Sequence, residues 1–146
     1  MDINLSTENY QINGQVNSDG TTLIMQVPET GHVTTKSLPQ TESILAKYLP
    51  SIFKCKCFNE ANNDFKQECK NTELGHLFEH IMLEHLCMEK IANGQEEATY
   101  EGRTNWNWEK DPVGTFNINI TAGLADLRNI EKAFKKSAGL LAKIIA

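Results

Sequence analysis

The sequence lacks any apolar run that approaches the roughly 18 residues needed to cross a bilayer. Its first residues, MDINLSTENY, also lack the basic and then apolar plan of a signal peptide, so we expect a cytoplasmic protein with no membrane-bound part. Basic residues are scarce: 14 lysines and arginines stand against 19 acidic residues, a net charge of -5 at pH 7. Because phosphate binding needs a basic face, this balance argues against nucleic acid as a partner.

Two common motifs are missing as well. No phosphate-binding sequence G-x-x-x-x-G-K-[ST] occurs, which argues against ATP-dependent ligation by this chain alone. The C-x-x-C pairs of zinc–thiolate sites are also absent, although Cys55, Cys57 and Cys69 resemble half of such a site. Since no export signal accompanies the four cysteines, we predict ordinary reduced thiols rather than disulfides or structural zinc.

What is present fits one globular domain over residues 1–146. A hydrophobic share of 40% and a charged share of 23% are typical of a folded chain of this length. Periodicity predicts an α+β fold, in which a small, mainly antiparallel sheet packs with about three helices. The expected strands are 2–12, 20–28, 98–106 and 114–121, the expected helices are 41–53, 72–92 and 125–146, and the polar segment 54–71 is expected to be a surface loop or lid.

The helix over 72–92 is the most informative element. Asn71 or Thr72 is expected to cap its start, and Asn93-Gly94 is expected to end it. Most of its circumference is apolar, which predicts a central buried helix. Its remaining side carries polar residues: His76, Glu79, His80 and Glu84.

These polar residues have the spacing of a metal centre. His76 and His80 lie one turn apart on the same side of the helix, where two imidazoles can chelate one zinc ion. Glu79 completes the pattern H-x-x-E-H, in which the carboxylate acts as general base beside a zinc-bound water. The motif leaves open an alternative in which this is a polar stripe satisfied by protein partners. Either way the side chains need partners, since burying an unpaired polar group costs roughly 1–3 kcal/mol.

The third metal ligand is harder to assign. Glu84 is the candidate, yet it lies two turns from His76, about 12 Å along the helix. Cys87, His85 and an acidic residue in the segment 55–70 are the alternatives. His85 points about 100° away from His80, which favours a core or partner-facing role for it.

Three segments resemble the amino-terminal domain of cyanophycin synthetase. "TELGHLFEHIMLE" (72–84) is similar to that family's pattern T-x-L-G-H-x-x-E-H-x-x-L-E. "YLPSIFKCKC" (48–57) resembles its leucine-proline segment, and "EGRTNWNWEKDPVGTFNINI" (101–120) resembles its G-R-T segment and following P-G-x-Y-N strand. The order and spacing agree over roughly residues 45–120. Departures are Phe116 in place of tyrosine, Asn105 in place of the arginine after G-R-T, and His85 in place of an apolar residue.

The resemblance implies a metallopeptidase-like site without the family's two ATP-dependent ligase domains. Carried over by position, His76 and His80 would be zinc ligands, Glu79 the base, and Glu84 a further ligand or a supporting residue. Arg103, of the G-R-T segment, would stabilise an oxyanion or hold a substrate carboxylate, or simply lie exposed at a strand end. Trp106 and Trp108 would line the cleft or pack against the sheet.

Two functions follow. The first is a zinc-dependent hydrolase that cuts cyanophycin-like or other peptides containing arginine and aspartate. The second is a non-catalytic binding or assembly module that serves a separate cyanophycin synthetase or Mur-ligase-like enzyme. The apolar carboxy-terminal helix, ending in LLAKIIA, would then pack into that partner or form a homodimer, unless it packs onto its own sheet.

Overall fold

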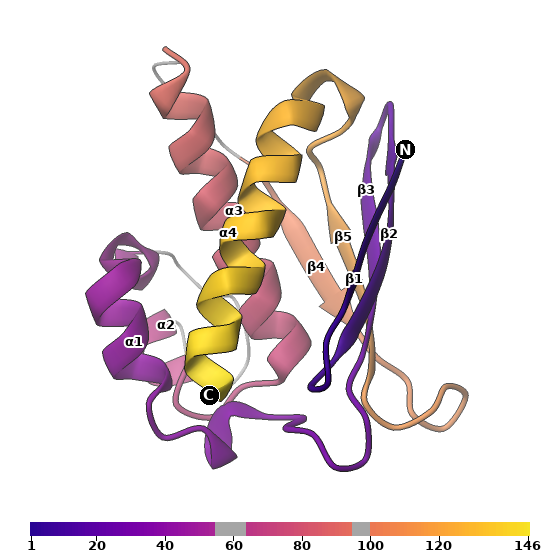
Figure 1. Cartoon of the computed structure of the whole chain (residues 1–146), viewed down its shortest axis with the longest axis vertical. Helices are drawn as coiled ribbons and strands as arrows, with labels where there is room; N and C mark the ends of the chain where they lie inside the picture. The colour runs from indigo at the N-terminus through magenta and orange to yellow at the C-terminus, as the bar shows by residue number, and fades with distance from the viewer. Residues whose placement is uncertain (55–63, 95–99) are drawn as a thin grey trace.

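The computed structural model describes residues 1–54, 64–94 and 100–146. Five strands form one antiparallel sheet in the order β1-β2-β3-β5-β4, and helices cover one of its faces (Figure 1). The α+β prediction is therefore confirmed. The strands are β1 (Asp2–Ser6), β2 (Gln11–Asn17), β3 (Gly20–Gln26), β4 (Gly102–Asn105) and β5 (Thr115–Ile120). The helices are α1 (Thr41–Tyr48), α2 (Phe65–Glu68), α3 (Leu74–Ala92) and α4 (Leu127–Ile145), with short 3-10 turns η1 (Thr35–Ser37), η2 (Pro50–Lys54) and η3 (Leu124–Asp126).

The amino-terminal segment contains one more strand than the sequence predicts. The predicted strand 2–12 is divided by a turn, in which the backbone amide of Tyr10 donates to Thr7 Oγ1 over 3.0 Å. Residues 13–17, which lie between the predicted strands 2–12 and 20–28, form most of β2. Gly14 caused the error, because its role is close packing: an added Cβ would lie 2.5 Å from Leu23 Cδ2.

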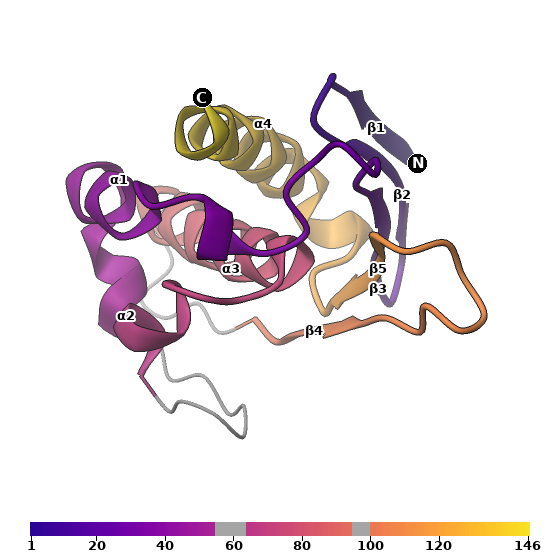
Figure 2. The same ribbon diagram turned by 90° about the horizontal axis from the view of Figure 1, so that it is seen from below.

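The core lies between the sheet and the helices. Alternate residues of β2, β3 and β5 are buried on the helical side, while the residues between them face solvent. The fully buried strand side chains include Ile12, Val16, Leu23, Met25, Phe116 and Ile118. Figure 2 shows β1 and β4 at opposite edges of this sheet, with α3 and α4 in the layer beside it.

The carboxy-terminal helix α4 packs within its own chain. Its buried side includes Ile130, Phe134 and Leu141, and the ring of Phe134 meets that of Phe78 in α3 edge to face, with centroids 6.0 Å apart. Of the alternatives left open by the sequence, packing onto its own domain is therefore the one observed. No helix in the described ranges has both the length and the apolar character needed to cross a membrane.

The segment predicted to be a surface loop includes α2, which is anchored in the core. Asp64 caps this short helix by accepting a hydrogen bond from the amide of Lys66, and Phe65 and Cys69 are fully buried. The Cys69 thiol is in no disulfide, and burial raises its pKa to about 11. Residues 55–63, with Cys55 and Cys57, lie outside the described ranges, so the prediction for their thiols stands untested.

Candidate metal centre

His76 and His80 face one another on the first half of α3. Their Nε2 atoms lie 3.1 Å apart, and their rings meet nearly at right angles with centroids 4.7 Å apart. The spacing of one helical turn that the sequence suggests therefore does bring two imidazole nitrogens together. Such a pair is the minimum set for chelation of one metal ion.

Each imidazole is held in place from outside the pair. Thr72 Oγ1 lies 2.7 Å from His76 Nδ1. When that nitrogen carries its proton and donates it to the hydroxyl, the lone pair of Nε2 is left for a ligand. Phe65 of α2 stacks on the His80 ring, with centroids 4.2 Å apart and planes 22° apart. The α2 helix thus fixes the orientation of one member of the pair.

Burial keeps His80 neutral at physiological pH. Its side chain is buried against Phe65, and this desolvation lowers its pKa to about 3, with a smaller contribution from the charge of His76. Metal binding requires the neutral imidazole, because protonation occupies the lone pair. His80 therefore needs no deprotonation step before it can bind a metal.

Glu79 lies beneath the edge strand β4. Only 5% of its surface is exposed, and Thr104 donates a hydrogen bond from Oγ1 to Glu79 Oε1 over 2.7 Å. Burial raises the pKa of Glu79, while the hydroxyl of Thr104 and the charge of His76 oppose that rise. A carboxylate with a raised pKa binds a proton more readily at neutral pH, as a general base must.

Gly102 allows β4 to approach this carboxylate. A Cβ added to Gly102 would lie 3.0 Å from Glu79 Cγ and 3.1 Å from Glu79 Cδ, closer than most real side-chain contacts. The glycine and Thr104 therefore bracket the glutamate from two positions of the same strand. The G-R-T segment supplies both residues.

The two histidines fit zinc, and the described residues supply no complete ligand set. Two nitrogens bound at about 2.0–2.1 Å to one tetrahedral zinc would lie about 3.3–3.4 Å apart, close to the 3.1 Å between the Nε2 atoms. Within residues 1–54, 64–94 and 100–146, no group of three His, Cys, Asp or Glu side chains is arranged to hold a metal. The pair offers two nitrogens, one fewer than the three protein ligands that a catalytic zinc usually has.

Three candidates for a third ligand, Glu84, His85 and Cys87, lie on the second half of α3. Of the acidic residues in the segment 55–70, Glu60 lies outside the described residues and Glu68 is buried in α2. Glu84 accepts a hydrogen bond from Ser51 of η2, over 2.7 Å between Oγ and Oε1. His85 is buried toward α4, where its Nδ1 lies 2.9 Å from Ser137 Oγ, which agrees with its predicted core role. Cys87 follows on the second half of the helix, where burial raises its pKa. A metal ligand from this half would need the helix or the side chain to move.

Arg103 lies on the other face of the sheet. In the sheet, Arg103 lies opposite Asn119 of β5, and Asn119 lies opposite Thr22 of β3. The side chains of these three residues are exposed. Thr104 belongs to the opposite row, which faces α3. Because neighbouring strand residues point to opposite faces, Arg103 cannot share the face of Glu79. The structure therefore does not bring Arg103 together with the histidine pair.

Trp106 and Trp108 form an aromatic group with Phe116. Each indole meets the Phe116 ring edge to face at 5.7 Å between centroids, and Trp108 Nε1 donates to the carbonyl of Thr115 over 2.9 Å. Phe116 is itself packed on Gly75, the residue before His76. Packing accounts for Trp108, whereas Trp106 keeps 40% of its surface exposed.

Sequence reasoning missed four residues that position the site: Thr72, Thr104, Phe65 and Ser51. Thr72 was assigned to the helix cap, yet the N-cap position is Glu73, which makes no side-chain capping bond. The signal for Thr72 was its spacing of four residues before His76, a helical neighbour spacing. The signal for Thr104 was its position directly after Arg103, which the sequence predicts to be a site residue. No local signal exists for Phe65 or Ser51, because only the tertiary fold brings α2 and η2 to α3.

A comparison with protein families matches residues 22–113 to the cyanophycin synthase-like N-terminal domain. The match covers more than half of the chain and contains both α3 and β4. The chain belongs to this family. Within the cyanophycin synthase-like domain, the histidine pair and its supporting residues Thr72, Phe65 and Thr104 all fall inside the matched range. No curated protein matches the chain.

Proposed function

We propose that this cyanophycin synthase-like domain is a zinc-dependent peptide hydrolase. The observation that carries the proposal is the pair of Nε2 atoms 3.1 Å apart, next to the buried carboxylate of Glu79. Zinc bound by His76 and His80 would supply a water of pKa about 7 and polarise the carbonyl of the scissile bond. The chain's own residues have to position the substrate and move the protons.

Glu79 is the proton carrier in this proposal. Its raised pKa suits it to accept a proton from the attacking water and later to donate it to the leaving amine. Thr104 holds one carboxylate oxygen by its hydrogen bond, which leaves the second oxygen to take the proton. Thr72 and Phe65 keep the two imidazoles oriented during the reaction.

We infer a substrate of cyanophycin-like character, or another peptide that contains arginine and aspartate. The family supports this choice, and the net charge of -5 suits a peptide with cationic side chains. The substitution of Asn105 for the family's arginine after G-R-T favours a peptide different from the family's own polymer.

Glu84 is proposed as the third ligand, and a pair of variants tests it. Glu84 would have to release Ser51 and turn toward the histidines. If it binds the metal, Glu84→Gln lowers zinc affinity about 10- to 100-fold or more, whereas Ser51→Ala leaves it equal or slightly tighter. Equal affinity in wild type and Glu84→Gln would remove Glu84 from the ligand set.

Metal content tests the proposal most directly. Elemental analysis of the purified protein is expected to give about one zinc per chain. His76→Ala and His80→Ala are each expected to lose the metal. A protein that stays folded but binds no zinc when zinc is supplied would overturn the hydrolase and favour the non-catalytic binding module.

A hydrolysis assay is the second test of the proposal. The zinc-loaded protein is incubated with arginine- and aspartate-rich peptides, and new amino termini are quantified. Wild-type protein is expected to release them, and the histidine variants are not. Zinc binding without cleavage of any such peptide would leave a metal site and reject the proposed substrate class.

A further inference from the structure

The edge strand β4 carries backbone groups that no strand of the described chain pairs with. The amide of Thr121 donates to the carbonyl of Glu101 over 3.0 Å, which marks this pair as hydrogen-bonded across β4 and β5. In an antiparallel ladder such pairs alternate, so Arg103 and Asn105 also bond to β5. The amides and carbonyls of Gly102 and Thr104 must therefore point away from the sheet.

The hydrogen bonds between β5 and β3 agree with this alternation. The amide of Val27 donates to the carbonyl of Gly114 over 2.9 Å, so alternate residues of β5 beginning at Gly114 bond to β3. The residues between them are left for β4. Trp108 Nε1 bonds the carbonyl of Thr115, one of these, at the point where β4 has ended.

These outward backbone groups belong to the two residues that bracket Glu79. Thr104 hydrogen-bonds its carboxylate, and Gly102 lies against its Cγ and Cδ. A strand added beside β4 would lie about 4.8 Å away, the usual spacing in a sheet. It would bond to the same two residues that contact the carboxylate used in the proposed hydrolysis.

We propose that the edge of β4, which no strand of the described residues covers, is the docking site for an extended peptide, which binds as a sixth strand of the sheet through Gly102 and Thr104. This deepens the proposed function, on which it rests, by stating how the substrate is held. An extended backbone matches the regular spacing of these donors and acceptors, and β-strand addition is a common mode of peptide recognition. The short length of β4, four residues, limits the contact to a few residues of the peptide.

The outer face of the edge adds selectivity for side chains. Glu101, Arg103 and Asn105 follow one another at every second position on that face and are exposed. A cross-strand neighbour of Arg103 would be acidic, and a neighbour of Glu101 would be basic. Arg103 thus holds a substrate carboxylate on the face of the sheet opposite Glu79. This is one of the two substrate roles that the sequence predicts for it.

Backbone methylation of a peptide tests this directly. The probe is acetyl-Thr-Val-Asp-Thr-Arg-Val-Thr-amide, added to isotope-labelled Glu79→Gln protein so that no hydrolysis occurs. Strand addition is expected to slow the hydrogen exchange of the Gly102 and Thr104 amides. Two probes carry N-methyl groups on alternate sets of amides. Because an added strand uses only every second amide, one probe is expected to bind about tenfold more weakly and the other nearly as well as the parent.

A side-chain control separates the charge contribution from the backbone contribution. Arg103→Gln is expected to weaken the parent peptide about two- to fivefold, and to have no effect on a probe with asparagine in place of aspartate. The proposal would be overturned if both methylated probes lost affinity equally. It would also be overturned if hydrogen exchange slowed at amides other than those of Gly102 and Thr104. Amides of Gly102 and Thr104 that are already protected in a concentration-dependent manner would overturn it as well, since a second copy would then occupy the edge.

The experiment distinguishes failure of the docking site from failure of the proposed catalysis. Strand addition in the Glu79→Gln protein, together with an inactive wild type, would reject the hydrolase and keep the docking site. Hydrolysis by wild type without protection at β4 would reject the docking site and keep the hydrolase.

Discussion

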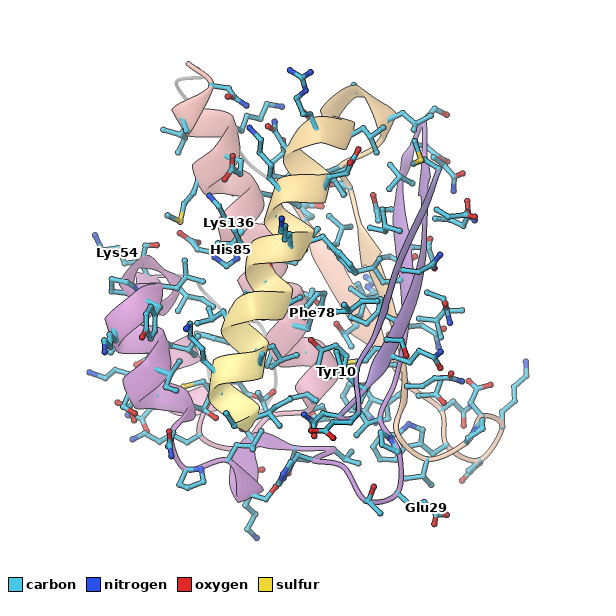
Figure 3. All side chains as sticks on the ribbon, viewed as in Figure 1. Tyr10, Glu29, Lys54, Phe78, His85 and Lys136 are labelled. Atoms are coloured by element: carbon cyan, nitrogen blue, oxygen red, sulfur yellow. The ribbon has the colours of Figure 1, made fainter. Side chains whose placement is uncertain are left out.

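In the first half of α3, Glu79 and His80 face β4 and α2, whereas in the second half His85 and Glu89 face α4. His80 lies between Phe65 and the imidazole of His76, and both of these contacts are ring contacts. His85 instead meets the hydroxyl of Ser137 over 2.9 Å. Figure 3 shows His85 close to Lys136, which forms an ion pair with Glu89. The same residue types on one helix therefore meet different chemical surroundings.

The difference shows what distinguishes the candidate metal centre from a polar stripe satisfied by protein partners. In the second half, a serine and a lysine of α4 satisfy the histidine and the glutamate, so the polar groups serve to join two helices. In the first half, the two imidazoles present nitrogen to nitrogen, and the side facing His80 on α2 is an aromatic ring. The second half is thus the polar stripe satisfied by protein partners, and the first half keeps the spacing that the proposed metal centre needs.

The largest expected effect is on the rate of peptide hydrolysis, and it distinguishes the two buried glutamates Glu79 and Glu89. Glu79→Gln keeps the metal and lowers the rate of peptide hydrolysis about 10²- to 10⁴-fold, because the proton carrier is lost. Glu89→Gln, the matched change in the second half, keeps the rate within a factor of about two while it breaks the ion pair with Lys136. Steady-state kinetics on zinc-loaded protein measure both, and equal losses would erase the distinction between the halves.

Two aromatic rings from other helices pack on the first half of α3: Phe65 stacks on His80, and Phe134 meets Phe78. Phe65→Ala and Phe134→Ala each remove a large ring from the core and are expected to cost about 3–5 kcal/mol of unfolding free energy. Only Phe65→Ala is expected also to weaken zinc binding, because Phe65 stacks on His80. Denaturant unfolding and zinc titration give the two quantities. Zinc affinity that falls equally in both variants would assign the loss to general destabilisation.

The pH dependence of the metal-free protein sharpens the comparison further. The pKa of His80 in the folded protein is about 3, below the unfolded value of about 6.5, so the folded state resists protonation. Its contribution to stability is complete above pH 6.5 and is lost as the pH falls toward 3. Between pH 7 and pH 5 this loss is about 2 kcal/mol.

His80→Gln isolates that contribution. The stability difference between pH 7 and pH 5 is measured in wild type and variant by denaturant unfolding, with a chelator present, so that other titrating groups cancel. The variant is expected to show the smaller decrease by about 2 kcal/mol. Parallel curves would mean that His80 binds a proton equally readily in the folded and unfolded states.

The smallest expected change in unfolding free energy concerns the hydroxyls that contact His76 and His85. Thr72→Ala and Ser137→Ala each remove one hydrogen-bond partner of an imidazole and are expected to cost about 1 kcal/mol of unfolding free energy. Thr72→Ala is further expected to lower zinc affinity about 10- to 100-fold, since Thr72 orients His76. Ser137→Ala leaves zinc affinity unchanged. Calorimetric zinc titration of both variants is the check.

Several features of the fold follow from local pattern. The apolar circumference of α3 gave its position to within two residues at the start and gave its end at Ala92. The strand β2 could not be predicted from local pattern, because Gly14 and the asparagines around it have the composition of a turn. Only the neighbouring Leu23 and Ile3, which occupy the space that a Cβ would need, explain the glycine.

The sequence by itself determined that His76 and His80 share one side of a helix, since a period of 3.6 residues requires it, and it marked Glu79 as their companion. Which neighbours meet those side chains was decided by the tertiary structure alone. Phe65, Ser51 and Thr104 are distant in the chain, and their approach depends on how α2, η2 and β4 pack against α3. Arg103 and Thr104 show the same division: alternation places them on opposite faces, but only the packing of α3 on the sheet selects Thr104 for the carboxylate.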